Sequence, residues 1–383
     1  MTLINDAFEP VRCAFASLFA SGEETGAALT VIHDGVVVIE ECGGWRDAGR
    51  RTPWTLDTLV GVYSVSKPVA ALCVLLLVAR GRLGLDDPVA RHWPEFGAAG
   101  KSEITVRQLL THTAGVVAFP EHVDAESTTA GSPAGSSADS SADSRPLVAA
   151  DLADWDLLVS SLAAAPPAWE PGTVAGEFAL TYGHPLGELV RRVDGRTLGA
   201  FLRDEIAVPW NLDCAFGLSA GQLARCADLE HGDPDWPRTS LGEPGSWRWK
   251  ALANPPGTRD LDVINGPLWR QTEIPAVNLH TTATALARLY ANLLSGGAGL
   301  FPASLITEAT SAQYTGFDLV LDREVTWTLG MQLEPDGSWG MGGIGGSCAF
   351  ADPSRGYAFA YTTRHLADFD RVDRLVDTLN ALL

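Results

Sequence analysis

The chain has 383 residues, 46% of them hydrophobic, which is enough to bury a substantial interior in one large or two-lobed domain. Its 47 acidic residues outnumber the 27 Lys and Arg residues, and the formal charge of −20 argues against nucleic acid or anionic membrane surfaces as partners. Residues 1–20 show no secretion signal and the apolar run 69–79 is too short to span a bilayer, so we expect a cytoplasmic protein that binds no membrane.

The first predicted element is a β-hairpin over residues 27–40. Two runs rich in β-branched residues flank Asp34-Gly35. A two-residue Asp-Gly connection favours the tight turn that joins antiparallel strands.

A helix is predicted next, and it begins with two residues that suggest chemistry. Ser64 and Lys67 precede the apolar run 69–79, Pro68 fits a first helical turn, and Gly81 is placed to end the helix. One turn apart, the serine and the lysine share a face. A serine hydroxyl needs an adjacent base, and a desolvated lysine with a depressed pKa can serve. The pair predicts a serine nucleophile whose own backbone N–H helps to bind the oxyanion. The alternative is a helix cap beside a surface lysine.

Helices dominate the middle of the chain, and short strands return near its end. Helices are predicted over residues 104–110, 148–165, 186–207, 281–294 and 368–383, and short strands over 327–363. Strands at both ends around a helical middle suggest a single split domain over 1–383. We expect an α/β lobe from about 1–62 and 275–383, with a helical lobe over about 63–274 inserted in it.

Two segments of this helical middle have unusual composition. Residues 124–145 are low-complexity Ser, Ala, Asp, Thr and Gly, which predicts a disordered surface insertion. Residues 223–269 are rich in Pro, Gly and Trp, which predicts a long irregular region suited to lining a pocket. Trp247 and Trp249 are the expected pocket residues of this region, although its tryptophans could equally be peripheral packing.

Four motifs together resemble the serine β-lactamase and penicillin-binding-protein superfamily. They are Ser64-Val65-Ser66-Lys67, Leu109-Leu110-Thr111-His112-Thr113-Ala114-Gly115, Trp169-Glu170-Pro171-Gly172-Thr173 and Gly342-Gly343-Ile344-Gly345-Gly346-Ser347. The likeness is greatest to the class C branch, the family VIII esterases and related transacylases.

This resemblance implies an α/β (α+β) fold of the β-lactamase/DD-peptidase type, in which helices flank an antiparallel sheet. It also implies an acyl-enzyme on Ser64 with Lys67 as its partner, and an oxyanion hole formed by the backbone N–H groups of Ser64 and Ile344. Met341, Gly342 and Gly343 are then expected beside the substrate.

The first departure from the family pattern concerns proton transfer. The family places a tyrosine six residues after the proline of its Pro-Gly turn, but counting from Pro171 reaches Glu177. Tyr182 follows five residues later and would take that place only after a local insertion. We favour the unshifted register, in which Glu177 is a general base if burial raises its pKa, and an exposed glutamate is the alternative. Both residues are kept as catalytic hypotheses.

The second departure is Met341, which stands where relatives carry lysine, or often histidine or tryptophan in the esterases. A thioether offers only soft apolar contact and cannot pair with a carboxylate. This disfavours penicillins and D-Ala-D-Ala peptides and favours a small uncharged acyl group.

Three functions follow, all with a small-molecule partner and without a cofactor. The first is a serine hydrolase that cleaves an ester or amide through an acyl-Ser64 intermediate. The second is a transacylase that passes the acyl group to an amine or alcohol, as in secondary metabolism. The third is a non-catalytic ligand-binding relative, which the loss of two family residues favours and the retained Ser64 and Lys67 oppose. The eight histidines form no cluster with metal-ligand spacing, so no metal is expected.

Overall fold

The computed structural model describes residues 7–124 and 144–383. Its largest sheet has eight strands in the order β2-β1-β14-β13-β12-β11-β10-β9, and every neighbouring pair is antiparallel. The strands are β1 (Gly26–His33), β2 (Val36–Gly44), β9 (Tyr314–Asp318), β10 (Arg323–Trp327), β11 (Gln332–Leu333), β12 (Trp339–Gly342), β13 (Cys348–Asp352) and β14 (Tyr357–Thr363). The sheet therefore draws its strands from both ends of the chain.

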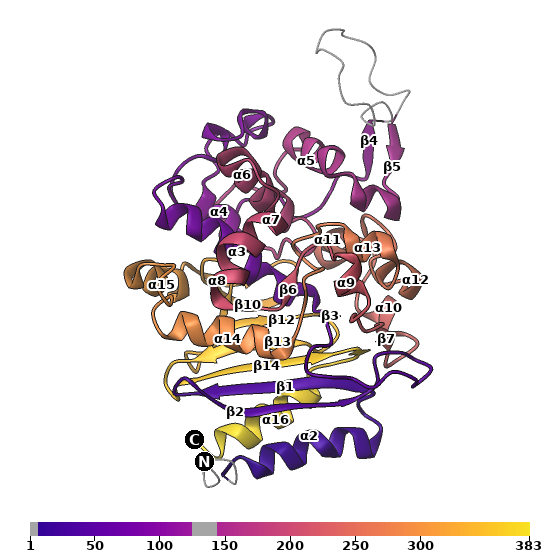
Figure 1. Ribbon diagram of the computed structural model, residues 1–383. Coiled ribbons are helices and arrows are strands. Elements are labelled where there is room, and N and C mark those ends of the chain that lie inside the picture. Colours follow the sequence, from indigo (N-terminus) through magenta and orange to yellow (C-terminus); the bar gives the residue numbers. More distant parts are fainter. Residues whose placement is uncertain (1–6, 125–143) are drawn as a thin grey trace.

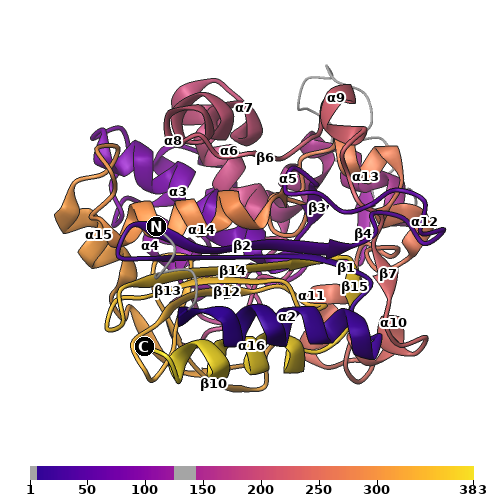
Figure 2. The ribbon, with the colours of Figure 1, turned by 60° about the horizontal axis from the view of Figure 1, so that its bottom comes forward.

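The predicted hairpin is confirmed as β1 and β2. Asp34 and Gly35 both have positive φ, 48° and 76°, as a tight hairpin turn requires. β1 is buried along almost its whole length because helices cover both faces of the sheet there. The helices α2 (Glu9–Ser21) and α16 (Asp370–Asn380) lie side by side on one face, and α14 (Ala283–Leu294) packs on the other (Figures 1 and 2).

Helices above the sheet surround α3 (Ser66–Ala79), which follows the serine (Figure 1). Twelve consecutive residues of α3 are buried, as expected for a helix that is apolar on all sides. It packs against α6 and α7. The surrounding helices are α4 (Val106–Leu110), α5 (Trp155–Ala164), α6 (Gly183–Asp194), α7 (Leu198–Leu202) and α8 (Val208–Trp210).

The remaining elements are short. Three strands form a small sheet in the order β3-β8-β6, and two further pairs are β15-β7 and β4-β5. They are β3 (Val60–Gly61), β4 (His122–Asp124), β5 (Ser144–Pro146), β6 (Cys214–Ala215), β7 (Glu230–His231), β8 (His280–Thr281) and β15 (His365–Leu366). The remaining helices are α9 (Ala220–Leu223), α10 (Trp236–Thr239), α11 (Trp247–Ala253), α12 (Leu261–Ile264), α13 (Pro267–Gln271) and α15 (Ala303–Thr310).

The structure confirms the predicted fold class and corrects several elements. The helix predicted over 186–207 ends at Asp194, because Gly195 adopts a left-handed φ of 94° and caps it. The helix predicted over 148–165 is likewise broken, and Asp154 caps the N-terminus of α5. The region 223–269 holds three short helices, the start of α13 and the strand β7, besides loops. α2, α15, β9 and β10 are not among the predicted elements.

Most of the predicted insertion over 124–145 lies outside the described residues. Its two ends pair as β4 and β5, with Asp124 opposite Ser144. In the part of the chain that the structure describes, no helix is long and apolar enough to cross a membrane.

Candidate active site

Ser64 lies in a single 3₁₀ turn, Tyr63–Val65, directly before α3. Tyr63 adopts a left-handed φ of 45°, a conformation that costs a non-glycine residue roughly 1–3 kcal/mol. Its side chain is held in place, since its hydroxyl donates to the Thr258 carbonyl oxygen at 3.1 Å and its ring packs near Trp236. The turn presents Ser64 to a pocket while Lys67, one turn later, is fully buried.

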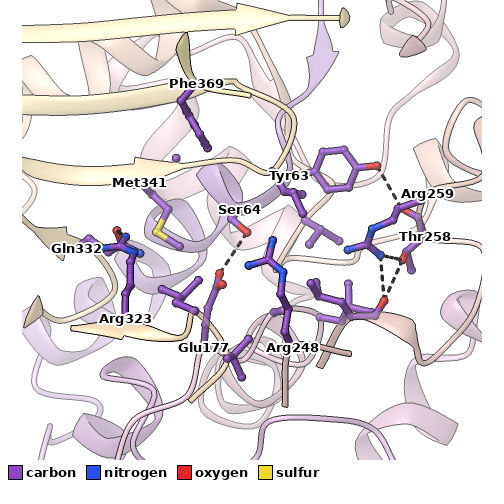
Figure 3. Close-up of a pocket in the computed structure, with 18 residues that line it drawn as sticks. Tyr63, Ser64, Glu177, Arg248, Thr258, Arg259, Arg323, Gln332, Met341 and Phe369 are labelled. Carbon is purple, nitrogen blue, oxygen red and sulfur yellow. Dashed lines mark hydrogen bonds between the residues drawn. The ribbon is translucent and has the colours of Figure 1, made fainter. Parts of the chain in front are cut away.

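Ser64, Lys67 and Glu177 form a triangle of hydrogen bonds (Figure 3 shows Ser64 and Glu177). Lys67 Nζ donates to Ser64 Oγ at 2.7 Å and lies 2.9 Å from Glu177 Oε1. The Ser64 hydroxyl donates to the same Oε1 atom at 3.3 Å. Burial lowers the pKa of Lys67, and the Glu177 carboxylate opposes that shift. The Glu177 carboxylate contacts both partners and can accept a proton from serine.

The backbone at Glu177 is fixed from two directions. Its N–H donates to Asp318 Oδ1 at 3.1 Å, and the next N–H, of Phe178, donates to His112 Nδ1 at 3.0 Å. Burial lowers the pKa of His112 well below its usual value, and the nearby Lys67 charge adds to that effect. The neutral imidazole therefore accepts through Nδ1 and acts here as a structural residue of its loop.

Asp318 is a fully buried carboxylate that holds this junction together. Besides Glu177, Oδ1 accepts the N–H groups of Val320 and Leu321, both at 2.9 Å, and Oδ2 accepts Trp327 Nε1 at 3.0 Å. Burial raises the pKa of Asp318, and these donors oppose the shift. Asp318 therefore ties the Glu177 segment to strands β9 and β10.

We predict that Asp318→Asn will destabilise the protein and lower its activity. The amide can still accept the three backbone N–H groups through Oδ1, but its NH2 group faces the Trp327 N–H, so two donors oppose each other. The expected loss is about 1–3 kcal/mol of unfolding free energy, measured by denaturant titration, with a lower kcat.

Asp322→Asn is the matched control for this change. Asp322 is exposed and has a φ of 56°, which asparagine tolerates. Unfolding of Asp318→Asn at the same denaturant concentration as the wild type would contradict the role given to Asp318.

The structure places Tyr182 away from the pocket. It is fully buried, its hydroxyl donates to the Leu110 carbonyl oxygen at 3.1 Å, and its ring packs on His112. Glu177, and not Tyr182, therefore lies beside Ser64 and Lys67, as the unshifted register from Pro171 requires.

Two backbone N–H groups are available near Ser64 to bind an oxyanion. Among the described residues, the N–H groups of Ser64 and Ile344 donate to no main-chain carbonyl. Gly343 brings the two segments together: a side chain there would place its first carbon 2.2 Å from the Val62 carbonyl oxygen. Only glycine permits this close approach.

The pocket in front of Ser64 has a volume of about 320 Å³. Met341 and Gly342 line it as expected, together with Ile344. Apolar and polar side chains complete the wall: Leu180, Leu252, Val277, Val320, Leu321, Phe369, Thr258 and Gln332. Gly343 is not part of the wall, because its backbone packs behind it against Val62.

The prediction that Trp247 and Trp249 line the pocket is wrong. The lining residues of α11 are Arg248 and Leu252, four positions apart on one helical face. Trp247 instead packs edge-on against Trp169, with ring centroids 5.4 Å apart. Neither Trp247 nor Trp249 lines the pocket.

Three arginines in the pocket wall were missed from the sequence: Arg248, Arg259 and Arg323 (Figure 3). They correct the argument built on Met341, since the pocket does hold cations that can meet a substrate carboxylate. No signal in the sequence separates them from the other arginines. Arg248 lies on the short helix α11, Arg259 in the turn after it and Arg323 at the start of β10, and none of these elements was predicted. No group of three or more Asp, Glu, His or Cys residues is placed to hold a metal ion within residues 7–124 and 144–383.

A serine one turn before a buried lysine at the start of a helix, beside an antiparallel sheet, is the arrangement of the serine β-lactamases, the penicillin-binding proteins and their esterase relatives. Residues 14–382 match the family model described as Beta-lactamase, and the chain belongs to this family. The resemblance drawn from the four motifs is thereby confirmed.

Several known proteins are similar to the chain over most of its length. The esterase/beta-lactamase LipL of Mycobacterium tuberculosis is 29% identical, over 94% of this chain and 81% of its own. A penicillin-binding protein homologue from Caulobacter crescentus is 37% identical with a TM-score of 0.82, covering 99% of this chain and 98% of the other. A family VIII carboxylesterase is 32% identical with a TM-score of 0.84, covering 98% of both chains.

Proposed function

We propose that the protein is a serine hydrolase that cleaves carboxylic esters through an acyl-enzyme on Ser64. The observation that carries this proposal is the triangle of Ser64, Lys67 and Glu177 at the floor of a pocket. Two similar proteins are named as esterases, which supports ester rather than peptide substrates.

Acylation uses each corner of the triangle differently. As Ser64 Oγ attacks the ester carbonyl carbon, its proton passes to Glu177 Oε1, to which the hydroxyl already donates. Lys67, which donates to both atoms, stabilises the developing negative charge on Oγ and orients the carboxylate. The tetrahedral oxyanion accepts from the N–H groups of Ser64 and Ile344. Glu177 then returns the proton to the leaving alcohol oxygen, and the C–O bond breaks.

Deacylation repeats these steps with water. Glu177 takes a proton from a water molecule that attacks the acyl carbon, and the proton then goes to Ser64 Oγ as the acid product leaves. An alcohol or amine in place of water would give the transacylase reaction from the same intermediate.

The size and wall of the pocket favour a small acyl group. A volume of about 320 Å³ is at the lower end of ligand pockets. Met341, Val320 and Leu321 provide apolar contacts, beside the polar Gln332 and Arg323, where a short acyl chain loses water on binding.

The proposal is tested with 4-nitrophenyl acetate, butyrate and dodecanoate. We expect turnover of the two short esters, a lower kcat/KM for dodecanoate, and a mass increase of one acyl group on the protein during the burst. Product analysis with an added amine or alcohol measures transfer against hydrolysis. Absence of both turnover and an adduct with a fluorophosphonate probe would favour the non-catalytic ligand-binding function.

A further inference from the structure

The pocket has two chemically different sides. Figure 3 shows Met341, Arg323 and Gln332 on one side of Ser64, and Arg248 and Arg259 on the other. Arg323 Nη2 donates to Gln332 Oε1 at 2.9 Å. Arg248 extends its guanidinium group toward Ser64 and Glu177, while Arg259 lies farther from Ser64, next to Thr258. An ester bound with its carbonyl carbon at Ser64 must send its acyl and alcohol parts in different directions.

One serine orients both arginines. Arg248 Nε donates to the Ser240 carbonyl oxygen at 3.0 Å, and Arg259 Nε donates to the Ser240 hydroxyl at 2.8 Å. Arg259 Nη1 is also occupied, by the Leu252 carbonyl oxygen and the Thr258 hydroxyl, both at 3.0 Å. For the two Nη atoms of Arg248 and for Arg259 Nη2, no hydrogen-bond partner is found among the described residues.

Among the described residues, no acidic side chain forms an ion pair with either of these arginines. Arg259 is only 5% exposed, yet neither it nor Arg248 forms an ion pair with a described residue. Buried arginines are nearly always paired, because an uncompensated charge away from water is costly. Two neighbouring guanidinium groups that form no ion pair with a described carboxylate leave room for a carboxylate from outside.

We propose that Arg248 and Arg259 form a carboxylate-binding subsite, and that the substrate is an ester whose alcohol part carries a carboxylate. A guanidinium fork matches the two oxygens of a carboxylate, and the free Nη atoms of Arg248 supply that fork. This inference rests on the proposed function for its chemistry. The acyl part then occupies the Met341 side.

The test compares two esters that differ only in charge, 3-acetoxybenzoate and its methyl ester. Hydrolysis transfers the acetyl group to Ser64 and releases the 3-hydroxybenzoate part, and water then frees acetate. We expect the wild type to prefer the acid over the methyl ester in kcat/KM by about tenfold or more, as for a charged hydrogen bond. Arg248→Gln should remove most of that preference.

Arg238→Gln is the matched control, because it removes the same charge from the same segment. Arg238 is 78% exposed, its nearest carboxylate is 3.9 Å away, and it does not line the pocket. The preference for the acid should survive this change. An equal loss in both arginine variants would overturn the proposal, because it would show an effect of overall charge.

A second pair of esters tests which part of the substrate carries the carboxylate. Mono-(4-nitrophenyl) adipate has a carboxylate in its acyl part and is compared with its methyl ester. A preference for the acid in this pair alone would overturn the placement of the carboxylate in the alcohol part.

Binding to the Ser64→Ala protein separates failure of the subsite from failure of the proposed function. Calorimetry with 3-acetoxybenzoate should show binding that is weaker for the methyl ester and is lost in the Ser64→Ala, Arg248→Gln double variant. Such binding in the absence of wild-type turnover would support the subsite and refute the hydrolase. Equal binding of acid and methyl ester would refute the subsite, whatever the turnover.

Discussion

Ser64→Ala should abolish ester turnover and covalent labelling together. Without Oγ no acyl-enzyme can form, and removal of a nucleophile that works in a coupled group costs roughly 10⁴-fold or more in kcat. Intact-mass analysis after reaction with a fluorophosphonate probe should show one adduct on the wild type and none on the variant.

The control for this experiment is Ser160→Ala. Ser160 is exposed on α5 and does not line the pocket at Ser64, so its loss should change neither labelling nor turnover. Labelling of the Ser64→Ala protein at the wild-type rate would show that the nucleophile is another residue.

Glu177→Gln should be the most damaging change that leaves the nucleophile in place. Glutamine keeps the shape of the side chain but cannot take a proton, so both acylation and deacylation should slow by about 10²-fold or more. Rapid-mixing burst kinetics with 4-nitrophenyl acetate measures the two steps separately.

Tyr182→Phe distinguishes the two registers after Pro171. Among the described residues, its hydroxyl bonds only to the Leu110 carbonyl oxygen. Its loss should therefore lower the unfolding free energy by about 1 kcal/mol and leave the burst largely intact. If Tyr182→Phe abolished the burst and Glu177→Gln had no effect, the proton-transfer role would belong to the tyrosine.

The catalytic side chains could be located from the sequence because local rules govern them. Ser64 and Lys67 lie one helical turn apart, and a turn has the same geometry in any fold. Glu177 can be located by counting six residues from Pro171. The count holds because no residue is inserted between the Pro171-Gly172 turn and Glu177. The hairpin at Asp34-Gly35 follows from turn chemistry in the same way.

The pocket wall could not be predicted in this way, because tertiary packing decides which face of a short helix meets it. In α11, the Trp-rich composition predicts that Trp247 lines the pocket, but Arg248 and Leu252 are the residues of this helix that face it. The strands β9 and β10 lie at the end of the sheet and are mostly exposed or half-buried, with several polar residues, so they lack a strong apolar signal. α2 does carry a signal, since Val11, Phe15 and Leu18 repeat at helical spacing and are buried.

The Asp318 carboxylate makes catalysis depend on how the segment before α6 packs against the edge of the sheet. Leu319 N–H donates to the Ala175 carbonyl oxygen at 3.0 Å, and the neighbouring Glu177 N–H reaches Asp318 itself. Glu177 therefore lies at the interface between the segment before α6 and the outermost strands of the sheet. If these hydrogen bonds break, Glu177 is no longer held in place, although Ser64 and Lys67 remain fixed by α3 and the turn before it. Heating should then inactivate the protein at the temperature where this interface separates. This should happen before the buried helix α3 unfolds.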